Sequence, residues 1–384
     1  MTVRICDVTF ADWISIEHAG RYTDTFIFHI DALNGLPPFG YRPLLQRLVA
    51  ELNQKRPGAS LWIRVDSPGE WYLAEIKRSL LRGLGIPYIV TRANEQPDYY
   101  SFSFRPRLFS PSLNRPPALD NGFSHVSMEA RKCLQVLGRI RKGNEDEIAS
   151  LTGLSKKVTL DILYGLKKNK LVEHKVGKKI QKDKSKPVEM DPFPLWHPTR
   201  RGLSIALRSW GASKKVDFSR VKELNPDKIC TPHRNTSRKW LAWLRSAYLR
   251  AEIWTGWSET HLPGISVFPD ALAWGRIQGY ETLFWLEVGD EHKSRKKIEK
   301  ITNKRLDEAW KLCKRTGIRL VYAQLSTNWV LEAARWACVK LPEGVAVVMG
   351  NRKRFGELPM VEWGNKSVIN EETESLIPSR WSDR

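Results

Sequence analysis

Two acidic residues occupy matching places in a pair of expected strands in the C-terminal half of the chain. The segments ISVFPDALAWGR and ETLFWLEVGDE predict paired strands that place Asp270 and Glu287 at corresponding inner positions. A carboxylate inside an apolar run such as FWLEV is costly to bury unless it has an ion-pair partner or binds a cation. Carboxylates on adjacent strands can hold Mg²⁺ or Mn²⁺, so a divalent-metal site is one interpretation. The alternatives are an ion pair of Glu287 with a nearby Lys, and a turn or strand-end role for Asp270 after Pro269.

The second group of residues that could have a binding role is basic and lies in the middle of the chain. SMEARKCLQVLGRIRK and NEDEIASLTGL predict two helices, with Ser127 and Asn144 as their N-caps and Glu147 three residues after Asn144. SKKVTLDILYGLKKNKLVEHKVG predicts a third helix that Ser155 opens, with Val158, Ile162 and Leu166 on one face, followed by a strand. This order of elements is typical of a winged helix.

A Lys-rich loop, KVGKKIQKDKSK, follows that strand where the wing is expected. Lysines of a wing contact phosphates, whereas base contacts come from the N-terminal part of the recognition helix. A solvated loop, or a winged helix that contacts protein, is the alternative. The candidate DNA-binding residues of the third helix and the wing are Lys156, Lys157, Thr159, Lys167, Lys168, Lys178 and Lys179.

The elements around Asp270 and Glu287 complete a third domain. TPHRNTSRKWLAWLRSAYLRAEIW, residues 231–254, predicts one long helix, in which Trp240 and Trp243 have core spacing. After the two strands, KSRKKIEKITNKRLDEAWKLCKRTG predicts a basic helix, and IRLVYAQL, NWVLEAARWACVK and GVAVVMGN predict strand, helix and strand.

The runs PDALAW and FWLEVGDE, with His233 ahead of a helix and a Lys-rich helix soon after, resemble the PD-(D/E)XK nuclease superfamily. More narrowly, they resemble the replication-relaxation family of plasmids and other mobile elements. The preceding winged helix, which ends in PTRRGL, fits the same family, and the resemblance covers residues 125–350. It implies DNA contacts by Arg200, Arg201 and His233, although His233 at a helix start also has a purely structural interpretation.

The resemblance also implies metal-dependent hydrolysis of DNA phosphodiesters, with Asp270 and Glu287 as ligands of Mg²⁺ or Mn²⁺. In the superfamily a Lys two residues after the second acid orients or polarises the attacking water, but Gly289 occupies that position here. A Lys of the following helix is the expected substitute. Lys300 is our first choice, and the alternatives are Lys293, Lys296 and Lys297.

The first 105 residues predict strand, helix, strand, helix, strand, strand, and hence a mainly parallel sheet covered by helices. Asp31 and Asp66 end the first two strands, where ligands of open α/β sheets gather, but capping of the following turns explains them equally. A nucleotide-dependent activity at these two acids is the weaker hypothesis because no Gly-rich phosphate loop precedes either helix.

The charge and composition of the chain indicate which kinds of partner and which compartment to expect. The 384 residues carry a formal charge of +21, which favours nucleic acid as a partner. There is no apolar run that could span a membrane, the start MTVRICDVTFADW has no secretory pattern, and the five cysteines form no CxxC pair. A cytoplasmic protein with no membrane partner is expected, and a homodimer or partner proteins of a mobile element remain open.

The sequence therefore predicts a multi-domain α/β protein with an N-terminal α/β sheet domain, a central winged helix and a PD-(D/E)XK nuclease-like domain. The expected boundaries are 1–105, a linker at 106–122, the winged helix at 123–212, the nuclease-like domain at 228–350 and a tail at 351–384. The expected function is that of a DNA-binding endonuclease of a mobile element. The alternative is a non-catalytic replication or transcription factor that keeps a degenerate nuclease fold as a scaffold.

Overall fold

The structure is a computed structural model. It describes residues 13–18, 21–55, 58–95, 126–176, 193–210, 232–246, 248, 251–258, 265–289, 294–326, 341–351 and 366–368. The chain folds into two compact units: Met1–Gly138 with Arg200–Asn225 (unit 1), and Arg139–Thr199 with Pro226–Arg384 (unit 2). These divisions differ from the predicted boundaries because they assign the expected winged helix partly to unit 1 and, over residues 139–199, to unit 2, and the predicted domains stay predictions.

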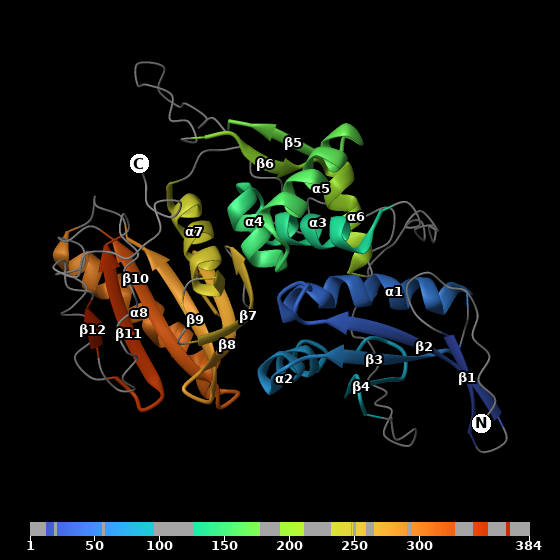
Figure 1. The fold of residues 1–384 in the computed structure, drawn as a ribbon. Helices are drawn as coiled ribbons and strands as arrows, with labels where there is room; N and C mark the ends of the chain where they lie inside the picture. Colours follow the sequence, from blue (N-terminus) through green and yellow to red (C-terminus); the bar gives the residue numbers. More distant parts are fainter. Residues whose placement is uncertain are drawn as a thin grey trace. The chain divides into compact units, whose positions relative to one another are not determined.

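Unit 1 contains a four-stranded sheet in the order β1-β2-β3-β4 (Figure 1). Its strands are β1 (Trp13–His18), β2 (Arg21–Asp31), β3 (Ser60–Asp66) and β4 (Tyr88–Arg92), and its helices include α1 (Tyr41–Lys55), α2 (Glu70–Ser79), most of α3 (Met128–Ile140) and α6 (Arg200–Ser209). A 3₁₀ turn, η1 (Pro38–Gly40), precedes α1. β2, β3 and β4 are parallel, which confirms the predicted parallel core.

The sequence pattern did not predict β1, which pairs antiparallel with β2. The last predicted strand, YYSFSF, lies outside the described residues. β3 shows why the parallel core was predictable, because five of its seven residues are buried, among them the apolar run Leu61, Trp62 and Ile63.

Unit 2 begins with the helix pair of the expected winged helix, α4 (Glu145–Thr152) and α5 (Lys156–Lys168). The predicted caps are confirmed: Asn144 and Glu147 form a capping box, and Ser155 accepts a hydrogen bond from the amide of Val158. The strands β5 (Val172–Lys175) and β6 (Leu195–Pro198) then pair antiparallel. The order of three helices followed by a strand is the one expected, and β6 and α6 come after them in the chain.

The buried face of α5 differs from the prediction. Thr159, Leu163 and Leu166 are buried, whereas Val158 is 43% exposed. Leu166 belongs to both the predicted and the observed face, so the observed face is rotated from the predicted one by less than the 100° between successive residues. Packing covers Leu163 completely, with 0% exposure.

The larger part of unit 2 is a six-stranded sheet in the order β12-β11-β10-β9-β8-β7 (Figure 1). Its strands are β7 (Ala251–Ser258), β8 (Ala271–Ile277), β9 (Tyr280–Val288), β10 (Arg319–Ser326), β11 (Val345–Asn351) and β12 (Lys366–Val368), and its helices include α7 (Pro232–Ser246) and α8 (Arg295–Lys314). β7, β8 and β9 are an antiparallel meander, and β9 to β12 are parallel.

The prediction of one helix over 231–254 was wrong. α7 ends at Ser246, and the residues from Ala251 form β7, which pairs with β8. The pairing of Ile253 with Gly275 and of Thr255 with Trp274 across to β8 outweighs the local helical pattern. The predicted pair β8 and β9 is confirmed, and Gln278 and Gly279 join the strands with positive φ values of 50° and 81°, as a type I′ turn requires.

Two further predictions for the C-terminal region can be compared with unit 2. The helix predicted from NWVLEAARWACVK lies outside the described residues. β12 pairs with β11, so part of the segment predicted as a tail belongs to the sheet. In the described part of the chain, no helix has the length and apolar character needed to cross a membrane.

Candidate functional site

Asp270 lies next to the end of β9, the strand that contains Glu287. Ala271, the first residue of β8, is the partner of Leu286, and Asp270 precedes β8 as Glu287 follows Leu286 in β9. The amide of Asp270 donates to the carbonyl of Leu286 at 3.0 Å, and its carboxylate Oδ2 accepts from the amide of Val288 at 2.7 Å. The carboxylate of Asp270 therefore lies beside the backbone of the residue that follows Glu287. The placement of the two acids at corresponding inner positions stays a prediction.

Glu287 is completely buried, with 0% exposure, and its two carboxylate oxygens have different partners. Oε1 accepts a hydrogen bond from the indole Nε1 of Trp285 at 2.9 Å. Oε2 lies 3.0 Å from Nη1 of Arg305, a residue of α8 with 26% side-chain exposure. The partner that a buried carboxylate requires is thus present, and it is an arginine.

The replacement of the lysine missing at Gly289 by a residue of the basic helix stays a prediction. The basic helix supplies the cation that pairs with Glu287, but Arg305 makes this contact and Lys300 is exposed. The helical phase is the physical reason. Ile298, Thr302, Leu306 and Ala309 define the buried face of α8, and Arg305 shares it, whereas Lys300 lies on the opposite side. Lys296 and Lys297 are exposed as well, and Lys293 lies outside the described residues.

Gln324 of β10 is a polar neighbour that the sequence analysis missed. The parallel register pairs it with Glu287, and it is 2% exposed. Its Oε1 accepts from the hydroxyl of Tyr322 at 3.3 Å. The available signal was a polar residue within the apolar strand RLVYAQLS. The same reasoning that singled out Glu287 in FWLEV therefore applies to this amide.

The donor set of Asp270 and Glu287 fits a small divalent cation in chemical type. Mg²⁺ prefers carboxylate oxygens, takes one or two of them, and completes its shell with water and substrate phosphates. Among the residues that the structure describes, no group of three or more His, Cys, Asp or Glu forms a complete protein-only metal site. At such a site, water and phosphate oxygens would complete the shell of an ion held by the two carboxylates.

Of the predicted DNA contacts on α5, three lysines are exposed, one lysine forms ion pairs and one threonine is buried. Lys157, Lys167 and Lys168 are exposed. Lys156 is half exposed and lies 2.9 Å from Asp146 and 3.8 Å from Glu145 of the preceding helix. Thr159 is 0% exposed, so its prediction as a DNA contact was wrong, because the residue belongs to the buried stripe of α5.

The remaining predicted contacts lie elsewhere in the chain. Arg200 and Arg201 are exposed at the start of α6 in unit 1, and His233 is partly exposed in the first turn of α7 in unit 2. Lys178 and Lys179 lie outside the described residues.

In unit 1, Asp31 and Asp66 are partners in the register of β2 and β3, at the carboxyl ends of both strands. Asp31 caps the following turn, where its Oδ1 accepts from the amides of Leu33 at 2.9 Å and Asn34 at 3.2 Å. Capping therefore accounts for this acid.

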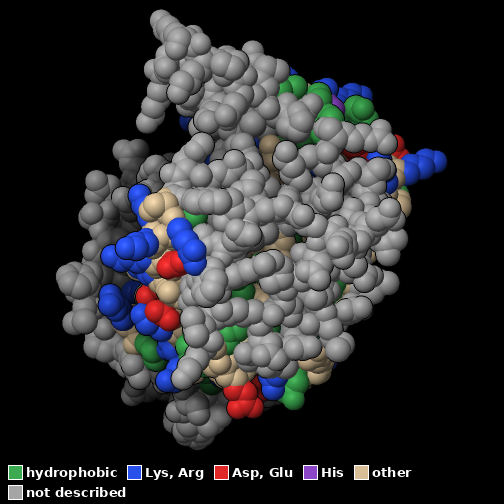
Figure 2. Space-filling view, turned by 90° about the vertical axis from the view of Figure 1, so that its left-hand side faces the viewer, with side chains coloured by type: hydrophobic (Ala, Val, Ile, Leu, Met, Phe, Trp, Pro, Cys, Tyr) green, Lys and Arg blue, Asp and Glu red, His purple; other side chains and the backbone are tan. Residues whose placement is uncertain are grey.

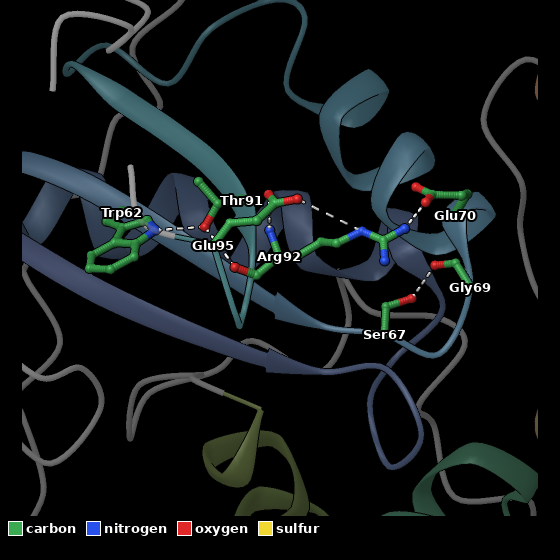
Figure 3. Close-up of polar contacts among 7 residues, drawn as sticks. All are labelled: Trp62, Ser67, Gly69, Glu70, Thr91, Arg92 and Glu95. Atoms are coloured by element: carbon green, nitrogen blue, oxygen red, sulfur yellow. Dashed lines mark hydrogen bonds and ion pairs between the residues drawn. The ribbon is translucent and has the colours of Figure 1, made fainter. Parts of the chain in front are cut away.

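The same edge of the unit 1 sheet carries an arginine held between two acids. Arg92 at the end of β4 contacts Glu70, the first residue of α2, and its amide donates to Oε2 of Glu95 at 2.9 Å (Figure 3). Trp62 donates to Thr91 beside it at 2.9 Å. These contacts fix the ends of β4 and α2 and leave the arginine neutralised.

No family model, no curated protein and no solved structure matches the chain.

Proposed function

We propose that the chain is a DNA-binding protein of a mobile genetic element whose unit 2 hydrolyses DNA phosphodiesters with a divalent metal ion, Mg²⁺ or Mn²⁺. The observation that carries the proposal is the pair of Asp270, directly before β8, and Glu287 on the neighbouring strand β9, with Arg305 against the buried acid. The resemblance of PDALAW and FWLEVGDE to the replication-relaxation family implies the same two acids.

The chemistry assigns each residue a role. A bound divalent ion would stabilise charge on the scissile phosphate and supply an activated water. Asp270 and Glu287 would hold that ion, since each carboxylate oxygen has more than one lone pair and an accepted hydrogen bond leaves another available. A guanidinium is a cation with five donors and no acceptor, so Arg305 would stabilise negative charge and would not act as a base.

Helix α5 supports the DNA-binding half of the proposal. Lys157, Lys167 and Lys168 are exposed on the helix that follows the capped turn, where a recognition helix is expected. Lys and Arg exceed Asp and Glu enough to give the chain a formal charge of +21, which favours a polyanionic partner.

A second candidate function, a non-catalytic DNA-binding scaffold, is favoured by one observation. Gly289 offers no side chain at the usual lysine position, and Arg305 already pairs with Glu287. In a scaffold this ion pair would serve only to satisfy the buried acid.

Cleavage of a mixed pool of supercoiled, linear and branched DNA in Mg²⁺ or Mn²⁺ separates these functions. Asp270→Asn and Glu287→Gln keep the side-chain shape and remove the charge, and both are expected to lose cleavage while DNA binding is retained. Glu281→Gln is the matched control, because Glu281 lies on the same strand and also accepts from a tryptophan, Trp274, at 2.8 Å. Wild-type protein that binds DNA and cuts no form of it would contradict the nuclease and favour the scaffold.

A further inference from the structure

The outer side of α8 carries a stripe of lysines that the proposed site does not use. The helix contains eight Lys and Arg and three acids. Residues three or four apart stand above one another on a helix. The face opposite the buried Ile298 and Ala309 therefore presents one row of exposed side chains, Lys296, Lys297, Lys300, Lys304, Lys311 and Lys314. Figure 2 views the side of the molecule that carries the six-stranded sheet and shows Lys and Arg gathered there around a few acids.

The acids of α8 leave most of this row unneutralised. Glu299 pairs with Arg295 at 3.0 Å, and Glu308 pairs with Lys311 at 2.9 Å. Asp307 is the remaining acid. Within the described residues, Lys296, Lys297, Lys300 and Lys304 make no ion pair. A local excess of positive charge therefore remains over the first half of the helix.

The spacing of the row fits a phosphate backbone. Lys296, Lys300 and Lys304 follow one another at about 6 Å along the helix axis, and the row to Lys311 extends about 22 Å. Duplex DNA presents a phosphate on each strand for about every 3.4 Å of its axis, so the row spans roughly six phosphates.

An anionic membrane surface fits the row less well. Membrane-surface helices insert an exposed apolar face between lipid head groups. The apolar side of α8, including Ile298, Leu306 and Leu312, is buried, and none of the exposed large hydrophobic residues belongs to this helix. A purely electrostatic partner is indicated.

We propose that the lysine stripe of α8 is a second, sequence-independent binding surface for the DNA phosphate backbone, in the same compact unit as α5 and the Asp270–Glu287 pair. This inference rests on the proposed DNA binding and adds to it the surface that holds the DNA beside the sheet. It does not require cleavage, because a scaffold would use the same contacts.

The test is the salt dependence of duplex binding by the full chain, measured by fluorescence anisotropy with a labelled duplex of arbitrary sequence. Removal of two phosphate contacts lowers the slope of log affinity against log salt by about two. We expect this decrease in Lys300→Gln/Lys304→Gln. The charge-preserving Lys300→Arg/Lys304→Arg is expected to keep the wild-type slope. Lys77→Gln/Arg82→Gln removes the same charge from exposed positions of unit 1 and is expected to leave the slope unchanged.

The outcomes distinguish the two proposals. Steep salt dependence in the wild type and an unchanged slope in Lys300→Gln/Lys304→Gln would overturn the α8 surface and leave the proposed function standing. A wild type that binds no DNA would overturn both. Equal losses in the α8 variant and the unit 1 control would show that net charge alone acts, and would also overturn the surface. Binding to vesicles of phosphatidylcholine with phosphatidylserine, without binding to DNA, would assign the stripe to membranes.

Discussion

Among single residues, Glu308 has a charge that its surroundings clearly stabilise. The backbone amide of Ser266 donates to its Oε2 at 2.7 Å and Lys311 donates to its Oε1 at 2.9 Å, and these hydrogen bonds lower the pKa of the carboxyl below its usual value of 4.5. A carboxyl whose folded pKa is lowered stabilises the protein above its unfolded pKa, and loses this contribution as the pH falls through the folded pKa.

Glu308→Gln tests this stabilisation. We expect the variant to be less stable than the wild type at neutral pH, and the difference to shrink as the pH falls below about 4.5. Urea unfolding at a series of pH values measures it. A difference in stability that stays constant down to the lowest pH would show that the charge of Glu308 contributes nothing.

The candidate site was predictable from sequence where a residue conflicted with its local pattern. Glu287 stood out because an acid inside FWLEV needs a partner, and the structure places it at 0% exposure. The identity of that partner was not predictable. Eight basic residues on α8 were chemically equivalent in sequence, and only the rotation of the helix about its axis directs Arg305, and not Lys300, toward the sheet.

Among the elements, a buried ion pair connects α4 to α7 within unit 2. Nε of Arg238 lies 2.6 Å from Oε2 of Glu147, and the side chains are 3% and 0% exposed. The same Glu147 oxygen accepts from the amide of Asn144 in the capping box. Ser150 of α4 also donates to the carbonyl of Ala242 at 2.9 Å. These contacts attach the first helix of the expected DNA-binding pair to the helix that begins the sheet domain.

Arg238→Met is expected to destabilise the protein by about 3–5 kcal/mol, because it leaves the charge of Glu147 buried without its cation. The double variant Glu147→Gln/Arg238→Met keeps a side chain that can accept the capping bond and removes the charge. We therefore expect it to recover most of the loss. Urea unfolding followed by tryptophan fluorescence measures both. Equal destabilisation in the single and double variants would contradict a role for the buried charge.

Helices and strands were predictable from the sequence where the local pattern of apolar and capping residues determines them. The continuous apolar strands β3 and β9 and the capped helices α4 and α5 were predicted from the sequence. β7 was not, because Ala251–Ser258 follow α7 closely and continue its apolar pattern, and only the pairing with β8 makes them a strand. β1 depends in the same way on the pairing with β2.

For the whole molecule, the two units explain why the sequence could not delimit the domains. Unit 2 combines α4, α5 and the six-stranded sheet, although the predicted winged helix and nuclease-like domain were separate segments. Interactions between residues distant in sequence, such as Glu147 with Arg238, contribute to this unit. Local sequence patterns do not predict such interactions. The proposed function therefore places DNA recognition by α5 and hydrolysis at Asp270 and Glu287 in one compact unit.

The most direct test of this account is whether the two acids bind a divalent metal. Free Mn²⁺ can be followed by electron paramagnetic resonance while the full chain in complex with duplex DNA is added, with the same DNA alone as reference. The account predicts that the wild-type complex removes more Mn²⁺ from solution than the DNA, and that Asp270→Asn and Glu287→Gln abolish the excess while Glu281→Gln preserves it. Identical Mn²⁺ binding by the wild type and both site variants would contradict a metal-dependent nuclease.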